Sequence, residues 1–194
     1  MRDNLARKRA TYDDLKRVPD HQVAEILDGE LTVSPRPSLQ HALVSSSLVA
    51  ILTPPYQHGR GGPGGWWIVH EPELHLGFEV MVPDIAGWRQ ERLRIPKGVG
   101  IKVAPDWVCE VLSPSTKNID RRVKMALYAQ EGVSYLWLAD PAPKTFELYR
   151  LVNGSWLPVA QYQGDVVVRA EPLDAIDLDL AVIWDGPAEE GPPA

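Results

Sequence analysis

The chain of 194 residues has 44% hydrophobic and 24% charged residues, a balance typical of a globular protein rather than a disordered or fibrous one. Its net charge of −6 gives no overall attraction to nucleic acid, and its single cysteine excludes an internal disulfide, which suits a cytoplasmic protein. The charged N-terminus is not a signal peptide, and no apolar run reaches the roughly 20 residues of a membrane span.

A β-hairpin is predicted near the N-terminus, after a short helix capped by Thr11. Residues 24–33 surround Asp28-Gly29, a favoured two-residue turn. Pairing Leu27 with Glu30 places a set of apolar side chains on one face, which we expect to be the core face: Ala24, Ile26, Leu31 and Val33. Glu25 and Glu30 then lie on the other face.

The remaining pattern predicts one mixed α/β (α+β) domain over residues 11–184, with flexible termini at 1–10 and 185–194. Ser38 begins a helix that Pro54-Pro55 ends, and the glycine-rich loop after it lacks the Gly-Lys-Ser/Thr of a phosphate-binding loop. A second helix is expected at 118–132, and strands are expected near 66–71, 73–76, 84–88, 104–112, 134–140, 145–152, 155–162 and 165–170.

One carboxylate stands inside a strand that should be buried. In APDWVCEVLSPST, residues 104–116, Glu110 shares a face with Val108 and Leu112, and the opposite face is also apolar. A charged carboxylate there is costly unless it is paired, hydrogen-bonded or bound to a metal. The residues alone leave two interpretations open, a buried ion pair with a lysine or arginine and a metal site.

Asp84 is the candidate partner of Glu110. Asp106 lies about 13 Å away along the same strand, too far for two carboxylates to share one metal. Asp84 belongs to another segment, and Pro83, which has no N–H, suits the start of a neighbouring strand. Such a strand would bring Asp84 to face Glu110.

The helix at 118–132 supplies a candidate cation. Its apolar stripe consists of Ile119, Val123, Ala126 and Leu127. Asp120, Lys124 and Tyr128 follow the border of that stripe, so Lys124 could lie against the sheet and extend its ammonium past it. The alternative is an ordinary surface lysine paired with Asp120.

Four stretches together resemble a known family: AEILDGELTVSPRPSLQH, VPDIAGW, PDWVCEVLSPST and DRRVKMALYAQEGVSYLWLADP. Their order, from about Thr11 to Trp156, resembles the Uma2 (DUF820) family, in the PD-(D/E)XK nuclease superfamily. The resemblance implies a restriction-endonuclease-like core, which is a mixed central β-sheet flanked by helices. With it come the N-terminal hairpin, a C-terminal antiparallel meander and a site that uses Mg²⁺ or Mn²⁺.

The resemblance also implies roles for particular residues. Asp84 and Glu110 would hold the metal, and Leu112 replaces the lysine that the superfamily has two residues after the glutamate. Lys124 matches the lysine that the family has on the following helix, with Lys117 as the competing candidate. Beside them, Glu30 is a candidate extra acidic group and His41 a candidate pocket residue.

Two functions follow from this resemblance. The first is a metal-dependent endonuclease that cuts DNA, with Lys124 orienting water or stabilising the transition state. Such an enzyme would be expected to form a homodimer, because cutting both strands usually takes two sites. The second is an inactive nuclease-fold module for binding or assembly. Basic residues that could contact a DNA backbone are Arg89, Arg92, Arg94, Lys97, Lys102, Lys117, Arg121 and Arg122.

Overall fold

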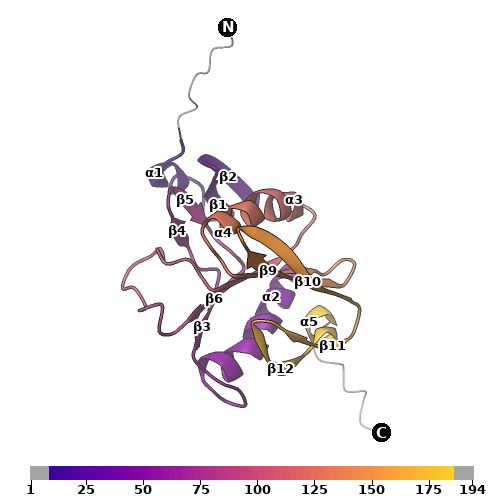
Figure 1. Cartoon of the computed structure of the whole chain (residues 1–194). Helices are drawn as coiled ribbons and strands as arrows, with labels where there is room; N and C mark the ends of the chain where they lie inside the picture. Colours follow the sequence, from indigo (N-terminus) through magenta and orange to yellow (C-terminus); the bar gives the residue numbers. More distant parts are fainter. Residues whose placement is uncertain (1–8, 186–194) are drawn as a thin grey trace.

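The computed structural model describes residues 9–185. They fold around a central, six-stranded mixed sheet (Figure 1). Its strand order is β10-β9-β8-β7-β6-β3, and only β7 and β8 run parallel. The strands are Trp66–His70 (β3), Ile85–Arg89 (β6), Trp107–Val111 (β7), Tyr135–Asp140 (β8), Thr145–Val152 (β9) and Ser155–Gln163 (β10). The predicted mixed fold class and the antiparallel meander β8-β9-β10 are confirmed.

Each face of this sheet has its own hydrophobic core. Helix α2 (Leu39–Leu52) and helix α5 (Leu180–Asp185) pack on the face that carries Trp107, Cys109 and Val111. On the other face, a helix passes through α3 (Lys117–Ile119), the wider turn η2 (Asp120–Lys124) and α4 (Met125–Gln130). Strand β7 is therefore buried along its whole length, as its two apolar faces predict.

A second sheet, with the order β2-β1-β5-β4, contains the hairpin. Its strands are Gln22–Leu27 (β1), Glu30–Pro35 (β2), Leu74–Leu76 (β4) and Glu79–Met81 (β5). The hairpin has the predicted register, with Leu27 opposite Glu30. The short helix α1 (Tyr12–Leu15) precedes it, and Thr11 caps that helix through a capping box.

The expected core face of the hairpin is right for Ile26, which is 2% exposed, but wrong for Leu31, Val33 and Glu25. Leu31 and Val33 are 38% and 42% exposed, whereas Glu25, on the other face, is 7% exposed. The carboxylate of Glu25 accepts the Val82 N–H at 2.7 Å and lies 3.2 Å from the Lys124 ammonium. Alternation shows that two faces differ, but a buried face can be polar when its charges are satisfied by partners from other segments.

The helix at 118–132 also turns a different face to the protein. Asp120, Lys124 and Tyr128, expected at its border, are 4%, 3% and 0% exposed, so an ordinary surface lysine is excluded at position 124. This polar row points towards Glu110. The apolar residues Ile119 and Val123 are only partly buried, at the edge of the core.

Pro54-Pro55 does not end the first long helix. The chain continues through one wider helical turn, η1 (Thr53–Gln57), closed by a hydrogen bond from the His58 N–H to the Thr53 carbonyl. Both prolines occupy the start of this turn, where a missing N–H is tolerated.

The C-terminal part contains elements that the sequence pattern did not predict. β11 (Val167–Ala170) leaves the meander and pairs with β12 (Leu173–Asp179), which, like β5 and α5, was not expected. Of the predicted flexible termini, most residues lie outside the described part, but the Ala10 N–H bonds the Gly29 carbonyl at 2.8 Å. Within residues 9–185, every helix is too short or too polar to cross a bilayer.

Candidate active site

A cavity of about 550 Å³ opens beside the carboxyl end of β7. Its walls come from the hairpin, the start of α2, residues 113–116 after β7, and the helix with η2. Asp84, Glu110, Lys124 and His41 all line it. Sequence-distant segments thus supply the polar groups of one enclosed site.

Asp84 and Glu110 meet at the floor of this cavity. Asp84 lies just before β6, which pairs with β7 so that Ile85 is opposite Cys109. The Asp84 N–H donates to Oε2 of Glu110 at 3.3 Å, and the Val111 N–H donates to Oδ2 of Asp84 at 2.7 Å. The strand pairing therefore holds the two carboxylates in a fixed relation.

Glu110 is nearly inaccessible, at 2% exposure, and two side chains contact its Oε1 atom. The Tyr128 hydroxyl donates at 2.5 Å, and the Lys124 ammonium lies at 2.8 Å. Burial raises the pKa of Glu110 well above its usual value, and Lys124 opposes this while Asp120, Asp84 and Glu25 add to it. Burial and the adjacent Glu110 also raise the pKa of Tyr128, which stays protonated as a donor.

The Lys124 ammonium lies close to oxygen atoms of three residues, donating to the Val82 carbonyl and pairing with Glu110 and Glu25. It lies 2.8 Å from Glu110, 3.2 Å from Glu25 and 3.2 Å from the Val82 carbonyl, with Asp120 at 3.9 Å. Burial alone would lower the pKa of Lys124, but Glu110 and Glu25 outweigh it and raise the pKa well above the usual value. Lys124 is therefore a permanent positive charge inside the site.

His41 reaches the site from the first turn of α2. Its Nε2 lies 3.2 Å from Oδ2 of Asp84, while Nδ1 is buried without a hydrogen-bond partner in the described structure. Burial lowers the pKa of His41, but the hydrogen bond to Asp84 and the charges of Asp84 and Asp120 raise it above the usual value. The Ser38 cap fixes this turn, since its hydroxyl accepts the His41 N–H.

Two predicted residues are not brought into the site. Glu30 and Lys117 are both exposed, and neither lines the cavity. Glu25 occupies the place expected of an extra acidic group, and the sequence analysis missed it because the hairpin was oriented by its apolar face. The sequence did contain a signal for Glu25. It is a carboxylate between Ala24 and Ile26 in a strand that packs on the protein, as Glu110 is in its own strand.

Comparison with known proteins identifies the family. A family model named Uma2, described as "Putative restriction endonuclease", matches residues 9–182. The chain belongs to the Uma2 family. A crystal structure of a "putative nuclease belonging to DUF820" from Anabaena variabilis superposes with a TM-score of 0.69 at 21% identity, covering 90% of this chain and 97% of that one. This likeness shows the shared fold, and no curated protein matches the chain.

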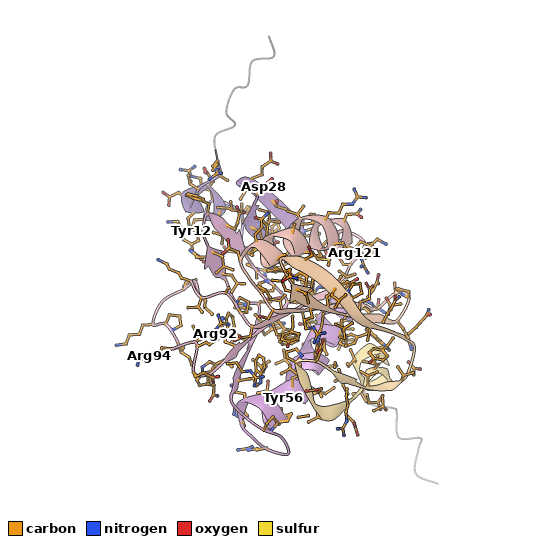
Figure 2. All side chains as sticks on the ribbon, viewed as in Figure 1. Tyr12, Asp28, Tyr56, Arg92, Arg94 and Arg121 are labelled. Atoms are coloured by element: carbon orange, nitrogen blue, oxygen red, sulfur yellow. The ribbon has the colours of Figure 1, made fainter. Side chains whose placement is uncertain are left out.

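The basic loop of this Uma2 protein lies away from the cavity. Loop 90–100 starts after Arg89, the last residue of β6. Asp84 lies at the other end of β6, so the start of the loop is about 16 Å from Asp84 along the strand. Asp106 holds this end, accepting from the Arg89 N–H and from Arg92. Figure 2 shows Arg94 projecting outward on one side of the molecule and Arg121 on the other. Arg121 itself pairs with Glu147.

Arg36, not singled out in the sequence, is the arginine that lines the cavity.

The donor set of the Uma2 site fits a hard divalent cation. Oδ1 of Asp84 accepts no hydrogen bond from the described residues, and Oε2 of Glu110 accepts only the long bond from Asp84. Two carboxylates with water in the remaining positions are the ligands that Mg²⁺ usually takes. Within residues 9–185, no three His, Cys, Asp or Glu side chains converge as a ready-made metal site, so such a cation would keep several waters.

Proposed function

We propose that this Uma2 protein is a metal-dependent endonuclease that hydrolyses the phosphodiester bonds of DNA. The observation that supports it most is the meeting of Asp84 and Glu110 on one cavity floor, with the buried ammonium of Lys124 2.8 Å from Glu110. Two carboxylates can hold a metal that assists phosphodiester hydrolysis, and a lysine beside them can stabilise the charge that develops on the phosphate. The family and the related fold point to the same chemistry.

The charge of the cavity supports the need for a cation. The acidic residues that line it outnumber the lysines and arginines; they are Glu25, Glu71, Asp84, Glu110 and Asp120, against Arg36 and Lys124. A DNA phosphate would be repelled from such a site. Mg²⁺ or Mn²⁺ held by Asp84 and Glu110 would reverse this repulsion, polarise the phosphate and lower the pKa of bound water.

The residues of the chain then divide the work. The Val111 N–H and His41 fix the Asp84 carboxylate, and the Tyr128 hydroxyl fixes that of Glu110. Lys124 places a positive charge beside the reacting phosphate, where negative charge develops in the transition state. Because Lys124 already donates to the Val82 carbonyl and pairs with Glu25 and Glu110, it acts through its nearby charge or by exchanging one of these partners for a phosphate oxygen.

DNA as the substrate and a homodimer as the assembly belong to this proposal. A double-strand cut requires both backbones to reach a cavity, which two copies of the chain would provide. Chemistry at Asp84 and Glu110 is independent of this arrangement, because both carboxylates come from one chain.

The proposal is tested with supercoiled plasmid and Mg²⁺ or Mn²⁺. We expect nicking by the wild type, which EDTA abolishes, and at least a hundredfold slower nicking by Asp84→Asn, since removal of a metal ligand or its support costs about that much or more. The matched control is Asp106→Asn, which changes the other Pro-Asp pair at the far end of β7 and should nick at close to the wild-type rate.

Equal nicking by Asp84→Asn and wild type would place the chemistry elsewhere. A folded wild type that cleaves neither DNA nor RNA with either metal would contradict the endonuclease and favour the binding module.

A further inference from the structure

Glu25 connects the hairpin to Lys124 and to the segment that carries Asp84. Its Oε1 atom accepts the Val82 N–H at 2.7 Å and lies 3.2 Å from the Lys124 ammonium. The same ammonium donates to the Val82 carbonyl at 3.2 Å. Glu25, Val82 and Lys124 thus form a closed ring of polar contacts, and Val82 lies two residues before Asp84.

This ring fixes two groups at once. The Val82 peptide belongs to the segment between β5 and β6, whose position decides where Asp84 meets Glu110. The ammonium of Lys124 sits at the end of a flexible side chain, and the ring limits its freedom. The ion pair within this ring is enclosed, since the side chains of Lys124 and Glu25 are 4% and 9% exposed.

We propose that Glu25 is a positioning residue, which holds the Lys124 ammonium and the Val82–Asp84 segment in place so that the N-terminal hairpin forms part of the active site. The proposal rests on the proposed function for its kinetic consequence, but the placement of Lys124 by Glu25 is testable without cleavage. Glu25 acts through Lys124 and Val82, and it makes no direct contact with Asp84 or Glu110 among the hydrogen bonds of the described residues.

Two substitutions separate geometry from charge. Glu25→Gln keeps an oxygen that can accept from Val82 and Lys124, whereas Glu25→Ala removes both contacts. We expect Glu25→Ala to lower kcat for plasmid nicking by about 10 to 100-fold with KM within about twofold, as for residues that orient catalytic groups. Glu25→Gln should stay within about threefold of wild type.

The matched control is Glu147→Ala. Glu147, on β9, is a partly buried carboxylate that lies outside the cavity. It pairs with Arg121, which is on the same helix as Lys124. Its loss should disturb packing and charge to a similar degree while leaving kcat within about twofold. Should Glu25→Ala fail to fold, Glu25→Asp replaces it, since the shorter side chain cannot span both contacts and should lower kcat by about tenfold.

Two further measurements do not depend on cleavage. The Lys124 ammonium should give a slowly exchanging ¹⁵Nζ resonance in wild type, Glu25→Gln and Glu147→Ala, and lose it in Glu25→Ala or Glu25→Asp. The Mn²⁺ dissociation constant should stay within about twofold in all of them, because Asp84 and Glu110 are retained.

The outcomes separate the two proposals. A wild type that never cleaves but shows the expected lysine resonances would overturn the endonuclease and leave the placement of Lys124 standing. An unchanged Lys124 resonance in the folded Glu25→Ala or Glu25→Asp protein would overturn the positioning role, as would a kcat no lower than that of Glu147→Ala.

Discussion

Glu110 shows how a buried carboxylate is tolerated in the middle of a sheet. It is 2% exposed, yet Tyr128 and the Asp84 N–H donate to it, and the Lys124 ammonium pairs with it at 2.8 Å. Of the two interpretations left open by the sequence, the ion pair with Lys124 is present in the structure, and the metal site stays a prediction. Hydrogen bonds and charge offset the cost of burial.

Asp120 gives a pH-dependent prediction at the same site. Burial raises its pKa from 3.8 to about 6, opposed by Lys124 and by a hydrogen bond from Thr116. Since the folded protein then holds a proton that the unfolded chain has lost, this group stabilises the fold less and less as the pH rises from about 4 to about 6. In EDTA, Asp120→Asn should gain stability relative to wild type by about 1 kcal/mol between pH 5 and pH 7.5, measured by urea unfolding.

A difference between the two proteins that stays constant over this range would contradict the raised pKa. Titrating groups far from Asp120 are common to both proteins, so their effect cancels in the comparison.

Residue-level prediction succeeded where strand geometry limits the choices. The position of Pro83 and the two-residue period of a strand are enough to favour Asp84 over Asp106 as the partner of Glu110. They could not reveal Glu25 or the contact between His41 and Asp84, because these depend on how the hairpin and α2 dock on the sheet. Such docking is decided by contacts between residues far apart in sequence.

At the scale of elements, β6 packs closely against its neighbours because Gly87, which has no side chain, lies between Trp107 and Trp66. A Cβ at position 87 would lie 2.9 Å from Trp107 and 3.4 Å from Trp66. Trp107 cannot easily move, since it packs edge-on against Trp137 at a centroid distance of 4.6 Å. The strand that holds Asp84 therefore depends on a glycine for its close approach to β7.

Gly87→Ala should accordingly destabilise the protein by about 1 to 3 kcal/mol, the usual cost of overpacking a core. Thermal or urea unfolding measures this change. Gly98→Ala is the control, because a Cβ there meets nothing within 4 Å, and it should leave stability unchanged within about 0.5 kcal/mol. A Gly87→Ala protein as stable as this control would show that Trp107 has room to yield.

Element prediction was reliable for the hairpin turn, the Ser38 cap and the buried β7, because each has a local physical cause. It failed for Glu25, Leu31 and Val33 of the hairpin and for β5, β12 and α5. β5 has three residues, and β12 alternates so many charges with its apolar positions that neither pattern stands out. β5 forms a strand by pairing with β1 and β4, and β12 forms one by pairing with β11.

For the molecule as a whole, an acidic cavity is lined by residues of the hairpin sheet, of the central sheet, of α2 and of the helix with η2. Glu25 and Lys124 bridge the hairpin sheet and the helix, and Glu110 and Asp84 come from the central sheet. We propose that a divalent cation completes this collection of carboxylates. Without one, like charges oppose each other across the cavity.

The most direct test is the melting temperature of wild type and Glu110→Gln, each in EDTA and with Mn²⁺. In EDTA, Glu110→Gln should melt at or above wild type, because it relieves repulsion while Lys124 keeps Glu25 and Asp120 as partners. Wild type should gain about 2.7 kcal/mol at a hundredfold excess of Mn²⁺ over its dissociation constant, and the variant far less. A large drop for Glu110→Gln in EDTA, with no response of wild type to Mn²⁺, would show a structural ion pair and contradict the metal site.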